Sequence, residues 1–167
     1  MFRDELLTRL PYKLPGRIYR SPMPFSPLFD PHGRVLDAYL DAGINTIVML
    51  TPINEVVELT GINLFDRYQQ LGFDVIHVPV EDFSVPEDGA FQKPIHETLQ
   101  AANAGKTIVI HCHAGLGRSG MFAACLAKVV FGLDGEQASR WVRGHIPRAV
   151  ETREQHDFIS NFQLELD

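Results

Sequence analysis

The feature that most constrains the fold is a β-branched run that leads through a glycine-containing stretch into a long apolar run. Residues 107–110 (TIVI) have the composition of a buried strand, and residues 121–130 have that of a buried helix. Gly115 and Gly117 lie in the segment that joins them. A strand-to-helix loop of this kind can turn successive backbone N–H groups inward at the positive end of the helix. The sequence therefore predicts an anion-binding loop over residues 111–120.

Two side chains of this loop carry chemistry that suits a phosphorylated substrate. Cys112 lies near its start and Arg118 near its end, with five residues between them. Helix N-termini and neighbouring cations stabilise a thiolate, which is the nucleophilic form of cysteine. The planar guanidinium of Arg118 can bind two phosphate oxygens at once. We therefore interpret Cys112 as a nucleophile and Arg118 as a phosphate ligand.

The order His111-Cys112-x5-Arg118-Ser119 resembles the signature of the cysteine-dependent protein tyrosine phosphatase superfamily. The resemblance implies that Cys112 forms a cysteinyl-phosphate intermediate without a cofactor, while loop amides and Arg118 hold the phosphoryl oxygens. The substrate-binding residues implied in this way are His113, Ala114, Gly115, Leu116, Gly117 and Arg118.

The same resemblance gives supporting roles to two neighbours of the nucleophile. His111 is expected to orient the loop and tune the thiolate, and not to act as a base. Ser119 stands where the family has a hydroxyl that helps the cysteine to leave in the second step. A serine there can also cap the following helix, and both interpretations stay open.

Attack on a phosphoester also needs an acid that protonates the leaving oxygen. Residues 80–86 (VEDFSVP) follow a predicted strand and place Asp82 four residues before Pro86, about thirty before Cys112. This segment resembles the general-acid loop of the dual-specificity phosphatases. We predict that Asp82 acts as the acid in the first step and as the base in the second. Glu81 is the alternative carboxylate, and an ordinary solvated loop position is the alternative interpretation of Asp82.

A weaker match lies in residues 148–155 (RAVETREQ), which resemble the glutamine-bearing segment beside the signature loop. Gln155 is expected either to orient the hydrolytic water or to be an exposed helix residue. Glu151 and Arg148 are expected to line the site.

Strand-like and helix-like segments alternate along the chain. Strands are predicted at 18–20, 44–50, 74–80 and 107–110, and helices at 34–42, 55–59, 64–71, 90–104, 118–131, 136–145 and from a Thr152 cap to about 164. This order predicts an α/β fold: a mostly parallel sheet of about four to five strands with helices on both faces, as in dual-specificity phosphatases. Ligands of such folds bind at the carboxyl ends of the strands, where Cys112 and Asp82 fall.

Length and charge narrow the class of protein. A chain of 167 residues is expected to form one domain, 1–167, and a net charge of −6 argues against non-specific nucleic-acid binding. No apolar stretch approaches 18 residues, so no membrane span is expected, and residues 1–10 are expected to pack on the domain as an amphipathic segment. We expect a monomer.

The two cysteines are too few for a disulfide framework, and a catalytic thiolate needs a reducing compartment. We therefore expect a cytoplasmic protein. Cys125 fits a buried structural position better than that of a redox partner for Cys112. No metal site is expected, since the side chains of residues 111–113 alternate in direction along a strand.

Size and motif order favour a compact dual-specificity type of enzyme acting on a phosphorylated protein or peptide. The main alternative is a phosphoinositide or other small-molecule phosphatase of the same superfamily. Tensin-homologue-type enzymes carry lysines within the signature, where this chain has His113 and Leu116. A phosphate-binding module without catalysis is the second alternative.

Overall fold

The computed structural model describes residues 6–165, and within that range the chain forms five strands and seven helices. The strands are β1 (Thr8–Leu10), β2 (Arg17–Ser21), β3 (Thr46–Met49), β4 (Asp74–His77) and β5 (Thr107–His111). The helices are α1 (Val35–Asp41), α2 (Ile53–Thr60), α3 (Leu64–Gln70), α4 (Gln92–Asn103), α5 (Gly117–Phe131), α6 (Gly135–His145) and α7 (Arg153–Asn161).

The strands form one sheet in the order β1-β2-β5-β3-β4. Strands β2 to β5 run parallel, and β1 pairs antiparallel with β2 at one edge. The register places Ser21, His111, Met49 and His77 side by side at the carboxyl ends of β2, β5, β3 and β4. The loops that leave these four strands therefore meet at one edge of the sheet, with the loop after β5 in the middle.

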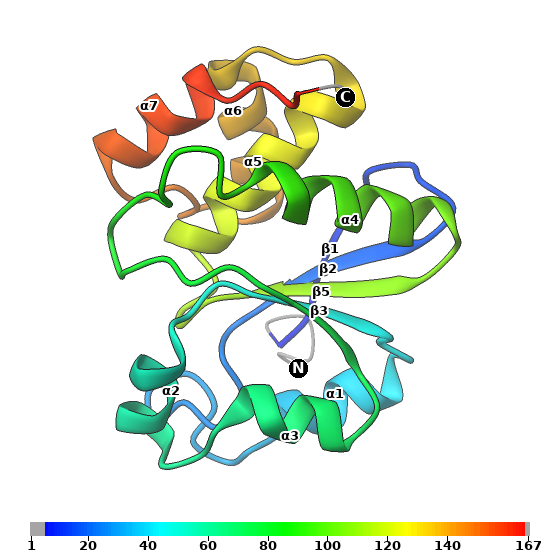
Figure 1. Ribbon diagram of the computed structural model, residues 1–167, viewed down its shortest axis with the longest axis vertical. Coiled ribbons are helices and arrows are strands. Elements are labelled where there is room, and N and C mark those ends of the chain that lie inside the picture. The colour runs from blue at the N-terminus through cyan, green and yellow to red at the C-terminus, as the bar shows by residue number, and fades with distance from the viewer. Residues whose placement is uncertain (1–5, 166–167) are drawn as a thin grey trace.

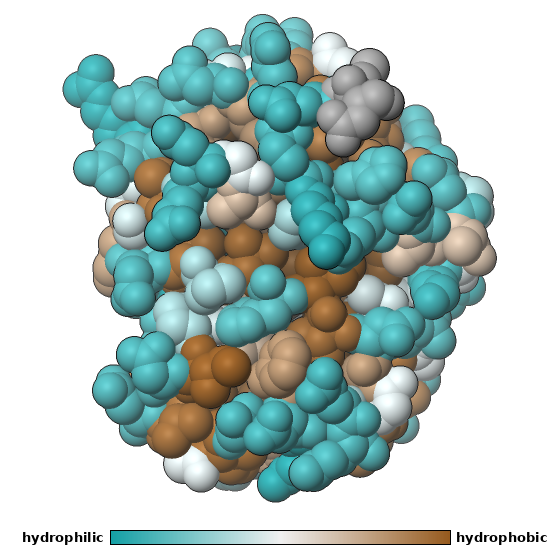
Figure 2. Space-filling model, viewed as in Figure 1, coloured by the Kyte–Doolittle hydropathy of each residue, from teal (hydrophilic) through white to brown (hydrophobic). Residues whose placement is uncertain are grey.

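Helices cover both faces of the sheet (Figure 1). Helices α1, α2 and α3 lie on one face, and α4, α5, α6 and α7 lie on the other. Each face has its own cluster of buried apolar side chains, and the sheet contributes residues to both. Figure 2 shows hydrophobic side chains that surface in a band across the middle of the molecule, between the two helical layers.

Helix α5 lies in the interior, and every residue from 117 to 127 is buried. Its small residues allow close packing against α6 and α7 on one side and the sheet on the other. Gly132 ends the helix in the left-handed conformation (φ 66°), which glycine adopts without strain. The N-terminus of α5 is thus fixed beneath the loop that follows β5.

The predicted α/β fold is confirmed, including the mostly parallel sheet with helices on both faces. Thr152 caps α7 as predicted, but α7 ends at Asn161 and not near 164. Strand β1 was not predicted: residues 8–10 add a strand to the sheet edge, where the sequence suggested only an amphipathic segment. The first five residues of that predicted segment lie outside the described residues.

Candidate active site

The loop after β5 holds its carbonyl groups on the outside. Each carbonyl of residues 112–116 accepts a hydrogen bond from a group around the loop. The pairs are His111 Nδ1 to Cys112 O (3.0 Å), Met23 N to His113 O (2.8 Å), Arg20 Nη2 to Ala114 O (2.8 Å), Arg20 Nε to Gly115 O (3.0 Å), and both Gly120 N (2.9 Å) and Val150 N (3.2 Å) to Leu116 O. In a planar trans peptide the N–H points opposite to the C=O, so the N–H groups of residues 113–117 face the inside of the loop. This arrangement is an anion-binding nest at the N-terminus of α5.

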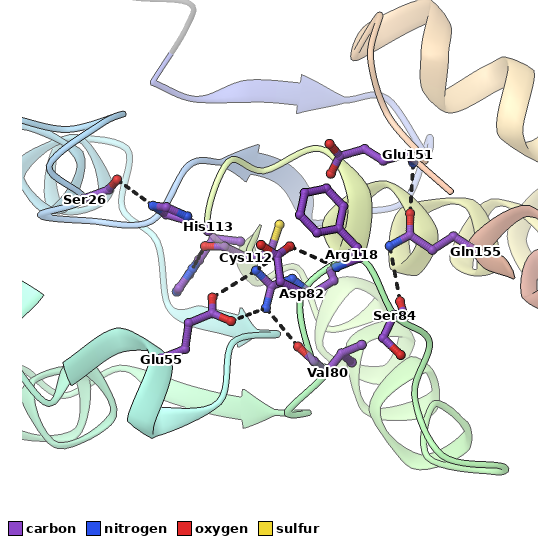
Figure 3. A network of polar contacts seen from close by, with 12 residues as sticks. Ser26, Glu55, Val80, Asp82, Ser84, Cys112, His113, Arg118, Glu151 and Gln155 are labelled. Carbon is purple, nitrogen blue, oxygen red and sulfur yellow. Dashed lines mark hydrogen bonds and ion pairs between the residues drawn. The ribbon is translucent and has the colours of Figure 1, made fainter. Parts of the chain in front are cut away.

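Cys112 and Arg118 flank this nest. Cys112 is buried at the end of β5, and Arg118 lies in the first turn of α5 with only 1% of its side chain exposed (Figure 3). Glu55, from the first turn of α2, binds both terminal nitrogens of Arg118 at 3.0 Å. The Val80 carbonyl accepts a further bond from Nη1 at 2.9 Å.

The guanidinium of Arg118 is therefore largely satisfied by the protein. Among the described residues its buried Nε has no hydrogen-bond partner. Burial alone would lower the pKa of Arg118, but the hydrogen bonds that it donates to Glu55 and the negative charges of Cys112, Glu55 and Asp82 raise its pKa above the ordinary value. Arg118 is thus a fixed positive charge with one N–H left for a ligand.

Asp82 approaches Arg118 from the loop after β4. Its Oδ1 lies 3.3 Å from Arg118 Nη2 and also accepts a bond from Phe83 N at 3.0 Å. The Asp82 side chain is 47% exposed, so it lies at the mouth of the nest. Glu81 is exposed and makes no hydrogen bond or ion pair with Arg118 among the described residues, which leaves Asp82 as the carboxylate of this loop that faces the site.

His111 links the backbone of Cys112 to helix α3. Its Nδ1 lies 3.0 Å from the Cys112 carbonyl, and its Nε2 lies 2.9 Å from the Tyr68 hydroxyl. A carbonyl can only accept, so Nδ1 carries the proton and Nε2 accepts from Tyr68. Burial lowers the pKa of His111 to about 4. The neutral imidazole supports the loop through hydrogen bonds at both nitrogens, so neither nitrogen is free to act as a base.

Segment 149–151 closes the other side of the nest. Val150 is held at φ 63°, a conformation that costs a β-branched residue about 1–3 kcal/mol. Arg143 binds the Val150 carbonyl, and Val150 N binds the Leu116 carbonyl. The Glu151 carboxylate consequently lies over Gly117, where a Cβ would collide with it.

Gln155 connects this segment to the loop that carries Asp82. Its Oε1 accepts from the backbone N–H groups of Glu151 (2.9 Å) and Thr152 (3.3 Å), and its Nε2 donates to the Ser84 carbonyl at 3.2 Å (Figure 3). Gln155 is fully buried. The side chain therefore ties the start of α7 to residues 82–86.

Residues 32–130 match the sequence model of a family described as "Polymorphic toxin system, DSP-PTPase phosphatase". That range is more than half of the chain and includes Glu55, Asp82, Cys112 and Arg118. The chain belongs to this phosphatase family.

Known proteins agree with this assignment. Cyclin-dependent kinase inhibitor 3 of Rattus norvegicus is 30% identical over 129 residues, which cover 75% of this chain and 60% of the relative. The chain thus spans about three-fifths of the length of that curated relative. The crystal structure of Tk-PTP in the active form is 29% identical with a TM-score of 0.73, over 90% of this chain and 92% of that one. Kinase-associated phosphatase, solved with serine in place of its catalytic-site cysteine, shares the fold: TM-score 0.82 at 23% identity, over 92% and 90% of the two chains.

Family membership confirms the resemblance inferred from the signature, and the structure rules out one alternative interpretation at each of two residues. Gln155 is not an exposed helix residue, because it is buried with both ends of its amide bonded to backbone. Ser119 is not a helix cap: the N-cap of α5 is Leu116, and the buried Ser119 hydroxyl has no partner among the described residues.

Three further predicted side chains have clear positions. His113 bonds to Ser26 Oγ at 2.9 Å and meets the Phe29 ring edge-on at 5.1 Å. Arg148 is exposed and makes no hydrogen bond or ion pair in the described part of the chain, so the structure does not join it to the site. Cys125 is buried in α5, as expected, and burial raises the pKa of its thiol.

Sequence reasoning missed Glu55 and Arg20. The available signal was positional: Glu55 lies in the first turn of the helix after β3, and Arg20 is a charged residue near the carboxyl end of β2. Both strands end at the edge where ligands of parallel sheets bind.

Within residues 6–165 no three His, Cys, Asp or Glu side chains gather closely enough to hold a metal ion. Over the same residues, no helix is both long and apolar enough to span a bilayer.

Proposed function

We propose that this phosphatase hydrolyses phosphomonoesters of protein or peptide side chains through a cysteinyl-phosphate on Cys112. The observation that carries the proposal is the convergence on Arg118: the Cys112 loop and the Asp82 carboxylate meet at one buried guanidinium. A nucleophile, an oxyanion nest and a carboxylate at its mouth are the three parts that this reaction needs.

In the first step, Cys112 Sγ attacks phosphorus in line with the leaving oxygen. The S–P bond forms, the P–O bond to the substrate breaks, and Asp82 gives its proton to the departing oxygen. The N–H groups of residues 113–117 and the free Nε–H of Arg118 bind the equatorial oxygens. The α5 N-terminus and the Arg118 charge stabilise the negative charge on sulfur before attack.

In the second step, water attacks the phosphocysteine. Asp82 takes a proton from the water, the S–P bond breaks, and inorganic phosphate leaves with Cys112 restored as a thiolate. The buried hydroxyl of Ser119 has no partner among the described residues. We propose that it donates a hydrogen bond to the departing sulfur. Gln155 is proposed to act through the Asp82 loop, because its amide already binds Ser84 and the start of α7.

Two exposed aromatic side chains support a phosphotyrosyl substrate. Phe29, 42% exposed, packs against His113, and Phe83, 58% exposed, follows Asp82 directly. Aromatic rings of this kind can pack against the ring of a phosphotyrosine. Several carboxylates also surround the nest, namely Glu55, Asp82 and Glu151, and these disfavour polyanionic substrates such as phosphoinositides.

The decisive experiment measures phosphate release from a phosphotyrosyl peptide under reducing conditions. We expect turnover by the wild type and none by Cys112→Ser. Asp82→Asn is expected to slow substrates with poor leaving groups much more than activated aryl phosphates. Equal turnover by wild type and Cys112→Ser would refute the mechanism. A wild type that hydrolyses phosphoinositides but not the peptide would refute the substrate class alone.

A further inference from the structure

Arg20 lies behind the anion-binding loop and holds two of its carbonyl groups. It is on β2, the neighbour of β5, where it pairs in register with Ile110. Its Nε donates to Gly115 O at 3.0 Å and its Nη2 to Ala114 O at 2.8 Å, while Nη1 reaches Thr8 Oγ1 on β1 at 3.3 Å. One guanidinium plane therefore binds two consecutive peptide units of the loop.

These two bonds determine which way two N–H groups point. Because C=O and N–H are antiparallel in a trans peptide, holding the Ala114 carbonyl outward turns Gly115 N–H inward. Holding the Gly115 carbonyl outward does the same for Leu116 N–H. The opposite orientation of either peptide would place a carbonyl dipole inside the nest, where it repels both a phosphoryl oxygen and a thiolate.

The loop has the freedom to make that change at Gly115. Gly115 lies at φ 79°, a region where glycine moves without steric cost. It also lies directly against Arg20, since a Cβ there would be 2.6 Å from Arg20 Nη2. The glycine thus allows the close approach of the guanidinium, and the guanidinium in turn restricts the glycine.

We propose that Arg20 is a positioning residue of the phosphatase reaction, which keeps the Gly115 and Leu116 N–H groups directed at the phosphoryl oxygens. The inference rests on the proposed function. Arg20 differs from Arg118 in its mode of action: it touches the loop's carbonyls from behind and not the substrate. Its partly buried charge also adds to the positive field around Cys112, since the two groups interact electrostatically.

The test compares binding of tungstate, an oxyanion that resembles phosphate, with steady-state hydrolysis of an aryl phosphate. Arg20→Met removes the hydrogen bonds to both carbonyl groups. Arg20→Lys keeps the positive charge but lacks the planar guanidinium that can donate to both carbonyls at once. Thr8→Val is the matched control, because it removes the hydrogen bond from Arg20 Nη1 to Thr8 Oγ1 and leaves the two carbonyl bonds in place. Arg140→Met is the charge control, because Arg140 is an exposed residue whose ion pair is with Glu136 on its own helix.

We expect Arg20→Met to weaken tungstate binding by about tenfold or more and to lower kcat by a similar factor, since losing one oxyanion donor costs about 100-fold to 1,000-fold in known enzymes. Arg20→Lys should lower tungstate affinity and kcat several-fold. In both controls, these two quantities should stay within about twofold of the wild type. Thermal unfolding checks that each variant is folded at the assay temperature.

Tungstate affinity within twofold of the wild type in folded Arg20→Met overturns the inference, as does a loss no larger than that of Arg140→Met. If Arg20→Met does not fold, Arg20→Lys decides, and unchanged affinity there overturns the inference. A wild type that binds no tungstate also overturns it, together with the anion site. A wild type that binds tungstate but lacks turnover refutes the proposed function alone, because binding needs no chemistry.

Discussion

Replacing Glu55 with glutamine tests whether the orientation of Arg118 depends on a partner from a different helix. Glutamine has the same shape, but it turns one of the two acceptors that face Arg118 into a donor. Breaking a buried ion pair costs about 3–5 kcal/mol. Glu55 is 19% exposed, and Arg118 would keep the Val80 carbonyl and Asp82, so we expect a smaller loss of about 2 kcal/mol.

That loss has two measurable consequences. For a chain of this size, about 2 kcal/mol lowers Tm by roughly 4–8 °C. A guanidinium that is no longer aimed at the nest should lower kcat/KM by about 10-fold to 100-fold. Glu58→Gln is the matched control, because it removes the same charge from an exposed position one turn along α2. The prediction is wrong if the Tm of Glu55→Gln stays within roughly 1 °C of the wild type and its kcat/KM within roughly twofold. It is also wrong if both changes are no larger than those of Glu58→Gln.

Three further predictions follow from buried polar groups. Burial lowers the pKa of His111 from 6.5 to about 4, so between these pH values the unfolded chain binds a proton that the folded chain does not. The free energy of unfolding therefore falls by up to about 3 kcal/mol as the pH drops from 6.5 to 4. Urea unfolding of His111→Asn should lack this part of the pH dependence. Gln155→Ala should lower the free energy of unfolding by about 1–3 kcal/mol and slow turnover of poor leaving groups most, whereas exposed Gln100→Ala should do neither; equal effects would contradict the structure. Ser119→Ala should be neutral or stabilising by up to about 1 kcal/mol while the phosphocysteine accumulates in rapid-quench experiments, and a destabilised variant with normal breakdown would contradict both expectations.

The fold was largely predictable because its signals are local. Alternating β-branched and helical segments each carry their own period, and the capping box of α7 can be read from Thr152 and Gln155. Strand β1 was not predictable in this way. Three residues are too few to show an alternation, and β1 is a strand only because β2 offers it an unpaired edge.

The candidate site likewise has a part that the sequence predicts and a part that it does not. The loop from Cys112 to Arg118 is contiguous, so its spacing was visible in the sequence. Glu55 lies 63 residues from Arg118, and Arg20 lies 95 residues from Gly115. No local pattern encodes such pairs, because they arise only when parallel strands bring their carboxyl ends to one edge.

That distance along the chain has a consequence for how activity appears during folding. The nest needs β2 on one side of β5 and α2 beyond β3 on the other, so it closes only after segments far apart in the sequence have met. Contacts of such long range form late, since the entropy of closing long loops must be overcome first. A chain emerging from the ribosome therefore carries Cys112 without its oxyanion nest until strand pairing is complete. Recovery of turnover after refolding reports the completion of the sheet and not the first collapse.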